Sequence, residues 1–249
     1  MKKEFENKYH NLESKHWWFK ARRNYIVSLL KNEPKNKDVL DIGCSSGNLL
    51  SDLENIGFNK AHLYGVDISK KAIDNCKKRN LNNTFVMDAQ QIELNKKFDI
   101  IIASDCLEHL KDDEKAVKNW GNLLKENGKL IIFVPAYNFL WSEHDEVNMH
   151  YRRYVKKDLK KLIENEKMII EKSSYWNFML FFPVVLYRYI NNKFVNSKNT
   201  TGDISKVNPI INFLLLSLLN FENSFLNFIN YPFGISTFCI AQKNENKND

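Results

Sequence analysis

Short apolar runs alternate with polar stretches over the first half of the chain. The run Val39-Leu40 leads into a turn of small residues from Gly43 to Gly47, and an apolar helix start follows at 48–50. A second apolar run then ends on the carboxylate Asp67. This order predicts a strand, a turn, a helix and a second strand, and the same alternation through residue 135 predicts a single α/β domain.

The turn between these two strands has the chemistry of a nucleoside site. Small residues let a ligand approach the backbone, and the start of a helix offers unpaired N–H groups. An acid at the end of the second strand, here Asp67, accepts the hydroxyls of a ribose. The turn itself contains Asp41, whose carboxylate repels a pyrophosphate but suits a cationic ligand. An ordinary tight turn without a ligand is the structural alternative.

The spacing of this turn is D-x-G-x-S-x-G, formed by Asp41, Gly43, Ser45 and Gly47. It resembles the first motif of the class I S-adenosylmethionine-dependent methyltransferases, which commonly reads D-x-G-x-G-x-G. Ser45 replaces the middle glycine. Its side chain either lowers the affinity for the ligand or donates a hydrogen bond to it.

Three later segments resemble the same family in the same order: 83–89, 98–110 and 120–134. The resemblance implies a doubly wound, seven-stranded, mostly parallel sheet with an antiparallel terminal strand. It places the last two strands at 167–174 and 235–242. It also implies that S-adenosylmethionine is the cofactor, held by a set of residues spread over the turn and the next three strand ends: Asp41, Gly43, Cys44, Ser45, Gly47, Asp67, Ile68, Asp88, Ala89, Ser104 and Asp105.

We divide the single domain into five segments: an N-terminal helical lid at 1–36, a cofactor-binding core at 37–135, an acceptor-side loop and helix at 136–175, an apolar helical insertion at 176–231, and a last strand with a polar tail at 232–249. The lid contains an aromatic stretch at 16–26 with helical spacing. A helix that docks its aromatic side chains on the sheet is the alternative to a lid.

Residues expected on the acceptor side follow the fourth and fifth strands. His144 beside Asp145 predicts a general base of near-neutral pKa, and His109 is a second candidate catalytic residue. The remaining candidates for binding the acceptor are Trp17, Arg22, Glu108, Arg153 and Tyr154. The spacing of the histidines and acids fits no standard metal site, so no metal is expected. The loop resembles one in uncharacterised bacterial and archaeal methyltransferases of the ubiquinone/menaquinone C-methylase-like (type 11/12) group. That likeness implies an acceptor that is a cell-surface sugar, a lipid or a lipid-linked intermediate.

The insertion at 176–231 contains two apolar stretches, 178–187 and 210–219, and neither approaches the ~20 uninterrupted apolar residues of a membrane span. Two helices that pack on the core or on a second copy in a homodimer are one interpretation. The others are a cap over an apolar acceptor and an interfacial pair that contacts a membrane peripherally.

Composition and charge narrow the range of functions and partners that are expected. The formal net charge is +7, but the lysines recur among asparagines and glutamates rather than in a stripe, which argues against a nucleic-acid partner. The four cysteines are scattered, and the N-terminus lacks an apolar signal core, so a cytoplasmic location is expected. The competing functions are a non-catalytic S-adenosylmethionine-binding or assembly protein and, with weaker motif support, an aminopropyltransferase, an NAD enzyme, or a nucleic-acid or protein methyltransferase.

Overall fold

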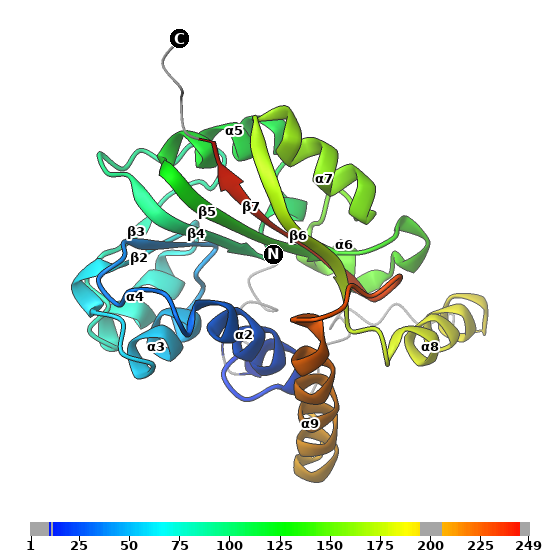
Figure 1. The fold of residues 1–249 in the computed structure, drawn as a ribbon. Helices are drawn as coiled ribbons and strands as arrows, with labels where there is room; N and C mark the ends of the chain where they lie inside the picture. Colours follow the sequence, from blue (N-terminus) through cyan, green and yellow to red (C-terminus); the bar gives the residue numbers. More distant parts are fainter. Residues whose placement is uncertain (1–9, 11, 195–205, 245–249) are drawn as a thin grey trace.

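The computed structural model describes residues 10, 12–194 and 206–244 and shows a seven-stranded sheet in the order β3-β2-β1-β4-β5-β7-β6 (Figure 1). Strand β7 pairs antiparallel with both β5 and β6, and the other neighbours are parallel. The predicted fold class is thereby confirmed. The strands are β1 (Val39–Ile42), β2 (Leu63–Asp67), β3 (Thr84–Val86), β4 (Phe98–Ser104), β5 (Leu124–Pro135), β6 (Met168–Trp176) and β7 (Ser236–Lys243).

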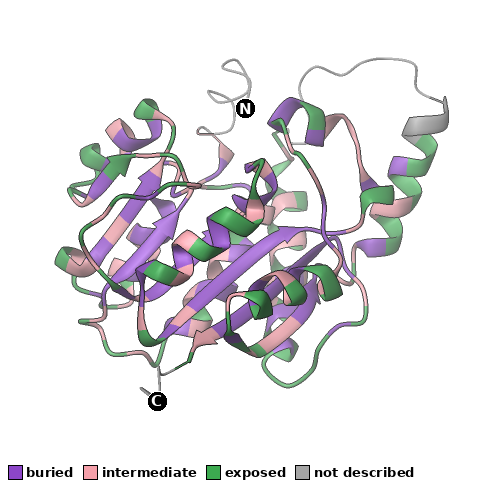
Figure 2. Ribbon diagram, turned by 90° about the horizontal axis from the view of Figure 1, so that it is seen from above, coloured by how far each residue is buried: buried purple, intermediate pink, exposed green. Residues whose placement is uncertain are grey.

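Helices cover both faces of the sheet, because successive residues of a buried strand point to opposite sides. Ile100 and Ile102 pack with α2, α3 and α9, whereas Ile101 and Ala103 pack with α5 and α7. Figure 2 shows the buried strands between helices that alternate buried and exposed positions. The helices are α2 (Trp17–Leu30), α3 (Asn48–Asn55), α4 (Lys70–Lys78), α5 (Asp113–Leu123), α6 (Glu143–Asn148), α7 (Lys156–Asn165), α8 (Phe181–Phe194) and α9 (Pro209–Leu226).

The insertion leaves and re-enters the sheet at the edge where ligands bind. Ser236, the first residue of β7, pairs with Pro135 at the end of β5 and with Trp176 at the end of β6. The carboxyl ends of the parallel strands and the two ends of the insertion therefore lie at one edge of the sheet. Ligands of open α/β folds bind at this edge.

Several element boundaries differ from the sequence expectations. Strand β3 has three residues within the family-like segment 83–89, because the chain turns at 88–91. Within the family-like segment 120–134, residues 126–129 belong to β5, with Asn127 in a left-handed conformation at φ 60°. Helices α8 and α9 extend beyond the apolar stretches that suggested them. Part of the polar stretch between them, 195–205, lies outside the described residues.

Candidate active site

The turn after β1 adopts the geometry that its small residues predict. Gly43 and Gly47 both have φ +73°, and a Cβ on Gly43 would lie 3.2 Å from Cys106. Ser45 is also left-handed, with φ 47°, a conformation that glycine adopts without strain. Its hydroxyl donates to Glu13 Oε2 at 2.6 Å, so the replacement of glycine adds a contact to the N-terminal segment.

Asp67 lies at the end of β2, half-buried, and contacts this turn. Its Oδ2 accepts a hydrogen bond from Ser45 N at 2.9 Å, and its Oδ1 accepts one from Ser69 N at 2.8 Å. Burial raises the pKa of Asp67, although these two backbone donors oppose the shift. The next residue, Ile68, is 76% exposed and lies beside it on the rim.

Asp88 and Ala89 follow β3 at the same edge. The exposed Asp88 accepts a hydrogen bond from Gln90 N at 2.8 Å, which orders the turn. The Ala89 carbonyl accepts one from the indole of Trp120 at 2.8 Å. A cavity of about 860 Å³ opens here, and its lining includes Gly43, Ser45, Asp67, Ile68, Asp88, Ala89 and Asp105 from the predicted cofactor set.

Two other residues of that set have different surroundings. Cys44 is buried, and its Sγ faces β2, where a Cβ on Gly65 would approach it to 2.8 Å. Asp41 is 4% exposed, and burial together with the charge of Asp67 raises its pKa to about 8. This shift favours the neutral acid over the carboxylate, and a cation beside Asp41 would oppose it.

A second, smaller cavity of about 70 Å³ lies between the turn and the N-terminal segment. Its walls carry buried polar atoms without hydrogen-bond partners among the described residues, namely Glu13 Oε1, Arg22 Nε and Asn48 Nδ2. Asp41, Ser104 and Asp105 complete the charged and polar lining. Unpaired buried polar atoms are costly, and a carboxyl group beside a guanidinium suits the ammonium and carboxylate of an amino acid. The cavity therefore fits the methionine end of S-adenosylmethionine.

Arg22 belongs to this smaller cavity, which corrects its expected place on the acceptor side. The side chain is 3% exposed and forms an ion pair with Asp105. Its guanidinium carbon lies 5.1 Å from the ring centroid of Trp18 and 4.9 Å from that of Trp176. The two aromatic faces and the Asp105 carboxylate together fix the position of the guanidinium.

The N-terminal helix combines the two alternatives proposed for it. Ala21, Tyr25, Ile26 and Leu30 of α2 are buried against the sheet, as a docking helix requires. Trp17 and Phe19 in its first turn line the larger cavity instead, as a lid does. Its amino end thus covers the site, while the rest of the helix is part of the core.

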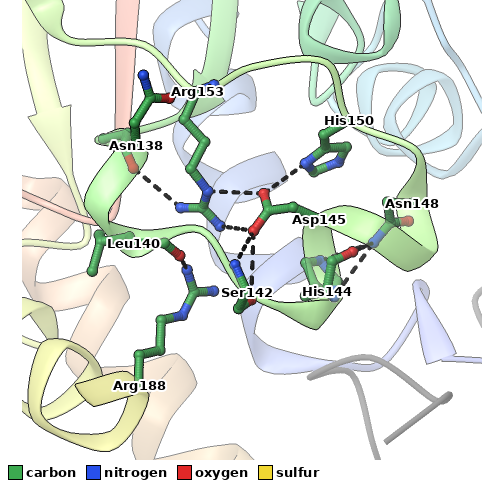
Figure 3. Close-up of polar contacts among 10 residues, drawn as sticks. Asn138, Leu140, Ser142, His144, Asp145, Asn148, His150, Arg153 and Arg188 are labelled. Carbon is green, nitrogen blue, oxygen red and sulfur yellow. Dashed lines mark hydrogen bonds and ion pairs between the residues drawn. The ribbon is translucent and has the colours of Figure 1, made fainter. Parts of the chain in front are cut away.

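The expected His144–Asp145 pair does not form. Asp145 is fully buried, and its carboxylate accepts hydrogen bonds from Arg153 Nε at 2.8 Å, Arg153 Nη2 at 2.9 Å and His150 Nδ1 at 2.8 Å (Figure 3). Burial alone raises the pKa of Asp145, but the His150 hydrogen bond and the charge of Arg153 outweigh it and hold that pKa well below its usual range. His144 contacts Asn148 and lines the larger cavity.

Tyr154 and Arg153 also differ from their expected roles. The Tyr154 hydroxyl donates to Asp113 Oδ2 at 2.8 Å, and its ring packs in the core beside α5 and α7, so it does not reach the cavity. Arg153 borders the larger cavity, but its guanidinium is used by Asp145 and by the carbonyl of Ala136. The physical reason is burial: at 6% exposure a guanidinium must be satisfied within the protein.

Glu108, His109 and His150 form the polar end of the larger cavity. Glu108 is 1% exposed, and neither carboxyl oxygen has a hydrogen-bond partner among the described residues. Burial and the nearby charge of Asp105 raise the pKa of Glu108 well above its usual range. Burial and the neighbouring His150 lower the pKa of His109 to about 3, so His109 is neutral at physiological pH.

The two histidine rings lie edge to face, with centroids 4.5 Å apart. One ligand atom from each of the three residues lies within 4.8 Å of the others, a grouping that sequence spacing does not predict because His150 comes from a distant loop. The expected absence of a metal therefore remains an untested prediction.

The sequence expectations missed Glu13 and His150 as residues of the site. His150 lay within the histidine-rich loop, so its residue type offered a signal. Glu13 precedes the aromatic helix in a polar stretch, and nothing in the local sequence distinguishes it from surface glutamates. Only the tertiary contact with Ser45 brings it to the cofactor turn.

Comparison with known proteins is consistent with this geometry. A family model described as a methyltransferase domain matches residues 15–168. The chain is 35% identical over 109 residues to a ubiquinone biosynthesis O-methyltransferase of Pelagibacter ubique, which covers 42% of this chain and 43% of that protein. It is 37% identical over 113 residues to the protein of the same name from Coxiella burnetii, with 42% and 46% covered. The chain thus matches less than half the length of these curated relatives.

Solved structures share the fold. A methyltransferase from Archaeoglobus fulgidus that is S-adenosylmethionine-dependent has a TM-score of 0.58 at 21% identity, with 90% of this chain and 92% of that chain covered. A putative methyltransferase in complex with the Haloferax volcanii Trm112 activator has a TM-score of 0.62 at 12% identity, with 98% and 100% covered. The chain therefore belongs to the methyltransferase-domain family.

Proposed function

We propose that this methyltransferase acts on a hydroxyl oxygen of a small amphiphilic acceptor, with Glu108 as the proton acceptor. The observation that carries the proposal is the buried carboxyl group of Glu108, which has a raised pKa and borders a cavity with an apolar far wall. The curated relatives are named as O-methyltransferases, which favours oxygen as the acceptor atom.

The cofactor is held along the carboxyl edge of the sheet in this proposal. Asp67 binds the ribose hydroxyls, and Asp88 with Ala89 binds the adenine. Glu13 and Arg22 bind the ammonium and the carboxylate of the methionine end, because they are oppositely charged groups that both line the smaller cavity. S-adenosylmethionine supplies an electrophilic methyl group on a sulfonium.

Glu108 has the properties of a base for a hydroxyl group. A raised pKa makes its carboxylate a stronger base than an exposed one, and proton transfer is most efficient when the pKa lies near the working pH. Glu108 would take the proton of the hydroxyl group as its oxygen bonds to the methyl carbon, while the carbon–sulfur bond of the sulfonium breaks and a neutral thioether leaves. The neutral imidazole of His109 lies in the same corner and orients the hydroxyl group through a hydrogen bond.

The far wall of the cavity suits an apolar part of the acceptor. It is formed mainly by aromatic and aliphatic side chains from α2, the end of α6 and the loop after it, α8 and the residue before β7: Trp17, Met149, Tyr151, Val184, Tyr187 and Ile235. Such a wall favours a ring or a chain over a free sugar, because burial of apolar surface contributes about 25 cal/mol per Å².

Methyl transfer from radiolabelled S-adenosylmethionine to three acceptors tests the proposal: an isoprenoid-tailed phenol with two adjacent hydroxyl groups, the same phenol without its tail, and phosphoethanolamine. The tailed phenol is expected to be methylated on oxygen with a KM about tenfold or more below that of the tailless one. Methylation of phosphoethanolamine alone contradicts the proposal. Tight cofactor binding without turnover of any acceptor favours a non-catalytic binding protein.

Glu108→Gln removes the base while preserving the shape of the side chain. Its kcat on the tailed phenol should fall about 10²–10⁴-fold, with the dissociation constant for S-adenosylmethionine unchanged. Glu146→Gln, an exposed position on α6, is the matched control and should retain full activity. A Glu108→Gln enzyme with undiminished kcat excludes Glu108 as the base.

A further inference from the structure

The two helices of the insertion present large apolar side chains to solvent. On α9 and the turn after it the exposed set is Ile210, Ile211, Phe213, Leu214, Phe221, Phe225, Phe228 and Ile229, and on α8 it is Phe182, Leu186, Tyr187, Tyr189 and Ile190. Phe213 is 65% exposed and Phe228 is 86% exposed. Figure 1 shows both helices extending from the end of the sheet where β6 ends and β7 begins. We call this set the α8–α9 surface.

The exposed apolar positions on α9 follow helical spacing. Ile210, Phe213, Phe221, Phe225 and Phe228 recur at intervals that place them along one stripe. The opposite stripe, with Leu219, Asn223 and Leu226, is buried, and Asn223 Nδ2 donates to the Ala21 carbonyl of α2 at 2.9 Å. Helix α9 is therefore fixed to the protein on one side and apolar on the other.

The α8–α9 surface carries no exposed carboxylate in 177–194 or 206–235, the parts of the insertion region that the structure describes. The single acid there, Glu222, is fully buried and accepts hydrogen bonds from the backbone of Phe178 and Met179. Two exposed lysines lie at its border. Lys206 precedes α9, and Lys15 lies beside α9 because Asn212 Nδ2 donates a hydrogen bond to its backbone carbonyl at 3.1 Å. The formal net charge of the chain is +7.

We propose that the α8–α9 surface binds the surface of an anionic lipid bilayer. An apolar stripe bordered by lysines, and without exposed acids among its described residues, is complementary to acyl chains beneath anionic headgroups. Contiguous exposed apolar patches of this kind are rare on soluble monomers and mark interaction sites. The binding does not depend on the acceptor proposed above.

The geometry favours a helix that lies in the interface over one that crosses the bilayer. Among the described residues α9 alone is long and apolar enough to cross a membrane, by length and composition. Its 18 residues span about 27 Å, which is short of the ~30 Å hydrocarbon core. Its buried stripe also contains Glu222 and Asn223 and is occupied by α2, so that only one face is available for lipid.

Helix α8 contributes to both the α8–α9 surface and the larger cavity. Phe182 and Leu186 face solvent. Val184, Tyr187 and Arg188 line the cavity. The Arg188 side chain donates to the Leu140 carbonyl and anchors α8 beside the acceptor loop (Figure 3). Docking on a bilayer therefore places the wall of the cavity next to the lipid.

Vesicle flotation with the full chain tests the proposal, using phosphatidylcholine vesicles with and without phosphatidylglycerol. The protein should float with the mixed vesicles, and high salt should weaken its binding. Phe213→Glu and Leu186→Glu, both at exposed positions, should each reduce binding by about tenfold or more. Circular dichroism and calorimetric binding of S-adenosylmethionine should be unchanged in both variants.

Ile169→Glu is the matched control, because Ile169 is 54% exposed on β6 at the end of the strand opposite α8. It should float like the unmodified protein. Failure to float with mixed vesicles overturns the proposal. A protein that does not float but forms a dimer that Phe213→Glu dissociates shows that a second copy covers the surface instead. Loss of flotation in the Ile169→Glu control also overturns the assignment to α8 and α9.

Discussion

Single residues at the site have unusual backbone conformations or unpaired buried polar groups, and both features are typical of ligand-binding sites. Ser45 and Asp105 hold left-handed backbone conformations without being glycine, and Glu108 keeps a buried carboxyl group without a hydrogen-bond partner among the described residues. Each feature costs stability, of order 1–3 kcal/mol. Such costs concentrate at functional sites, where the strain or the unpaired group acts on a ligand.

Asp67→Ala should weaken binding of S-adenosylmethionine by about 100-fold or more. The reason is the loss of charge-assisted hydrogen bonds to the ribose, each worth about 1.5–3 kcal/mol. Isothermal calorimetry measures the affinity, and circular dichroism verifies the fold. Asp74→Ala, a half-exposed α4 position paired with Lys70, is the control and should bind normally. Undiminished affinity in a folded Asp67→Ala protein would remove Asp67 from the cofactor site.

Glu108→Gln should stabilise the protein at pH 8 by about 1–3 kcal/mol and leave it nearly unchanged near pH 4. The folded-state pKa of Glu108 is raised above the unfolded value of about 4.3. The stability that its neutral form contributes is therefore present below pH 4.3 and is lost as the pH rises through the folded pKa. Glutamine stays neutral throughout. Thermal unfolding of both proteins across this pH range measures the difference, and parallel curves would contradict the assigned shift.

At the level of elements, the buried ion pair between Asp145 and Arg153 fixes the conformation of the loop after β5. The predicted catalytic pair, His144 and Asp145, does not. Asp145 also accepts a hydrogen bond from Ser142 N at 2.8 Å, which closes the amino end of α6. Arg153 links the same carboxylate to the Ala136 carbonyl at the end of β5. These contacts fix both ends of the loop. The loop positions three histidines around the cavity: His109, His144 and His150.

Asp145→Asn should destabilise the protein by about 3–5 kcal/mol, because it leaves the buried Arg153 charge without its counter-ion. The pKa of Asp145 is depressed, so its contribution is present above the unfolded value of about 3.9 and is lost as the pH falls through the folded value. Urea unfolding at pH 7 measures the loss. Asp158→Asn, exposed on α7, should change stability little, and equal effects of the two variants would refute the role of the ion pair.

At the scale of the whole molecule, the insertion is part of the core and not an appended cap. The Trp176 indole donates to Asn223 Oδ1 at 2.8 Å, and Tyr231 Oη donates to the Glu222 carbonyl at 3.0 Å. Leu219 and Leu226 of α9 join the same hydrophobic cluster as α2 and Phe133. Deletion of 177–230 should therefore expose the face of α2 and cause aggregation.

Glu222→Ala should lower the free energy of unfolding by about 2–4 kcal/mol, because two backbone N–H groups, of Phe178 and Met179, lose their acceptor. Since α9 is continuous with the core, unfolding should remain a single cooperative transition at a lower temperature. Differential scanning calorimetry shows whether it does. The exposed Glu114→Ala on α5 provides the baseline, and an early, separate α9 transition would contradict a continuous core.

The sequence by itself determined the fold class and the ends of the strands that carry the site. Two apolar runs end in Asp67 and Asp88, and small residues form the turn after the first strand. These features follow from which residues must be buried and which backbone conformations they must adopt, and both conditions are local to each segment. The resemblance to the methyltransferase family implied the seven strands, and the apolar stretches at 178–187 and 210–219 indicated the two helices of the insertion. The order of the strands in the sheet depends on pairing between distant segments.

Tertiary structure alone decided which side chains meet. Glu13 reaches Ser45, Arg22 joins the cofactor end, and Asp145 pairs with Arg153 and His150 in place of the adjacent His144. The raised pKa of Glu108 also arises from burial by distant segments. These outcomes depend on contacts and desolvation between residues far apart in the chain, and the local sequence pattern does not encode such contacts. The strands and turns depend on residues that are neighbours in the sequence, and the local pattern does encode them.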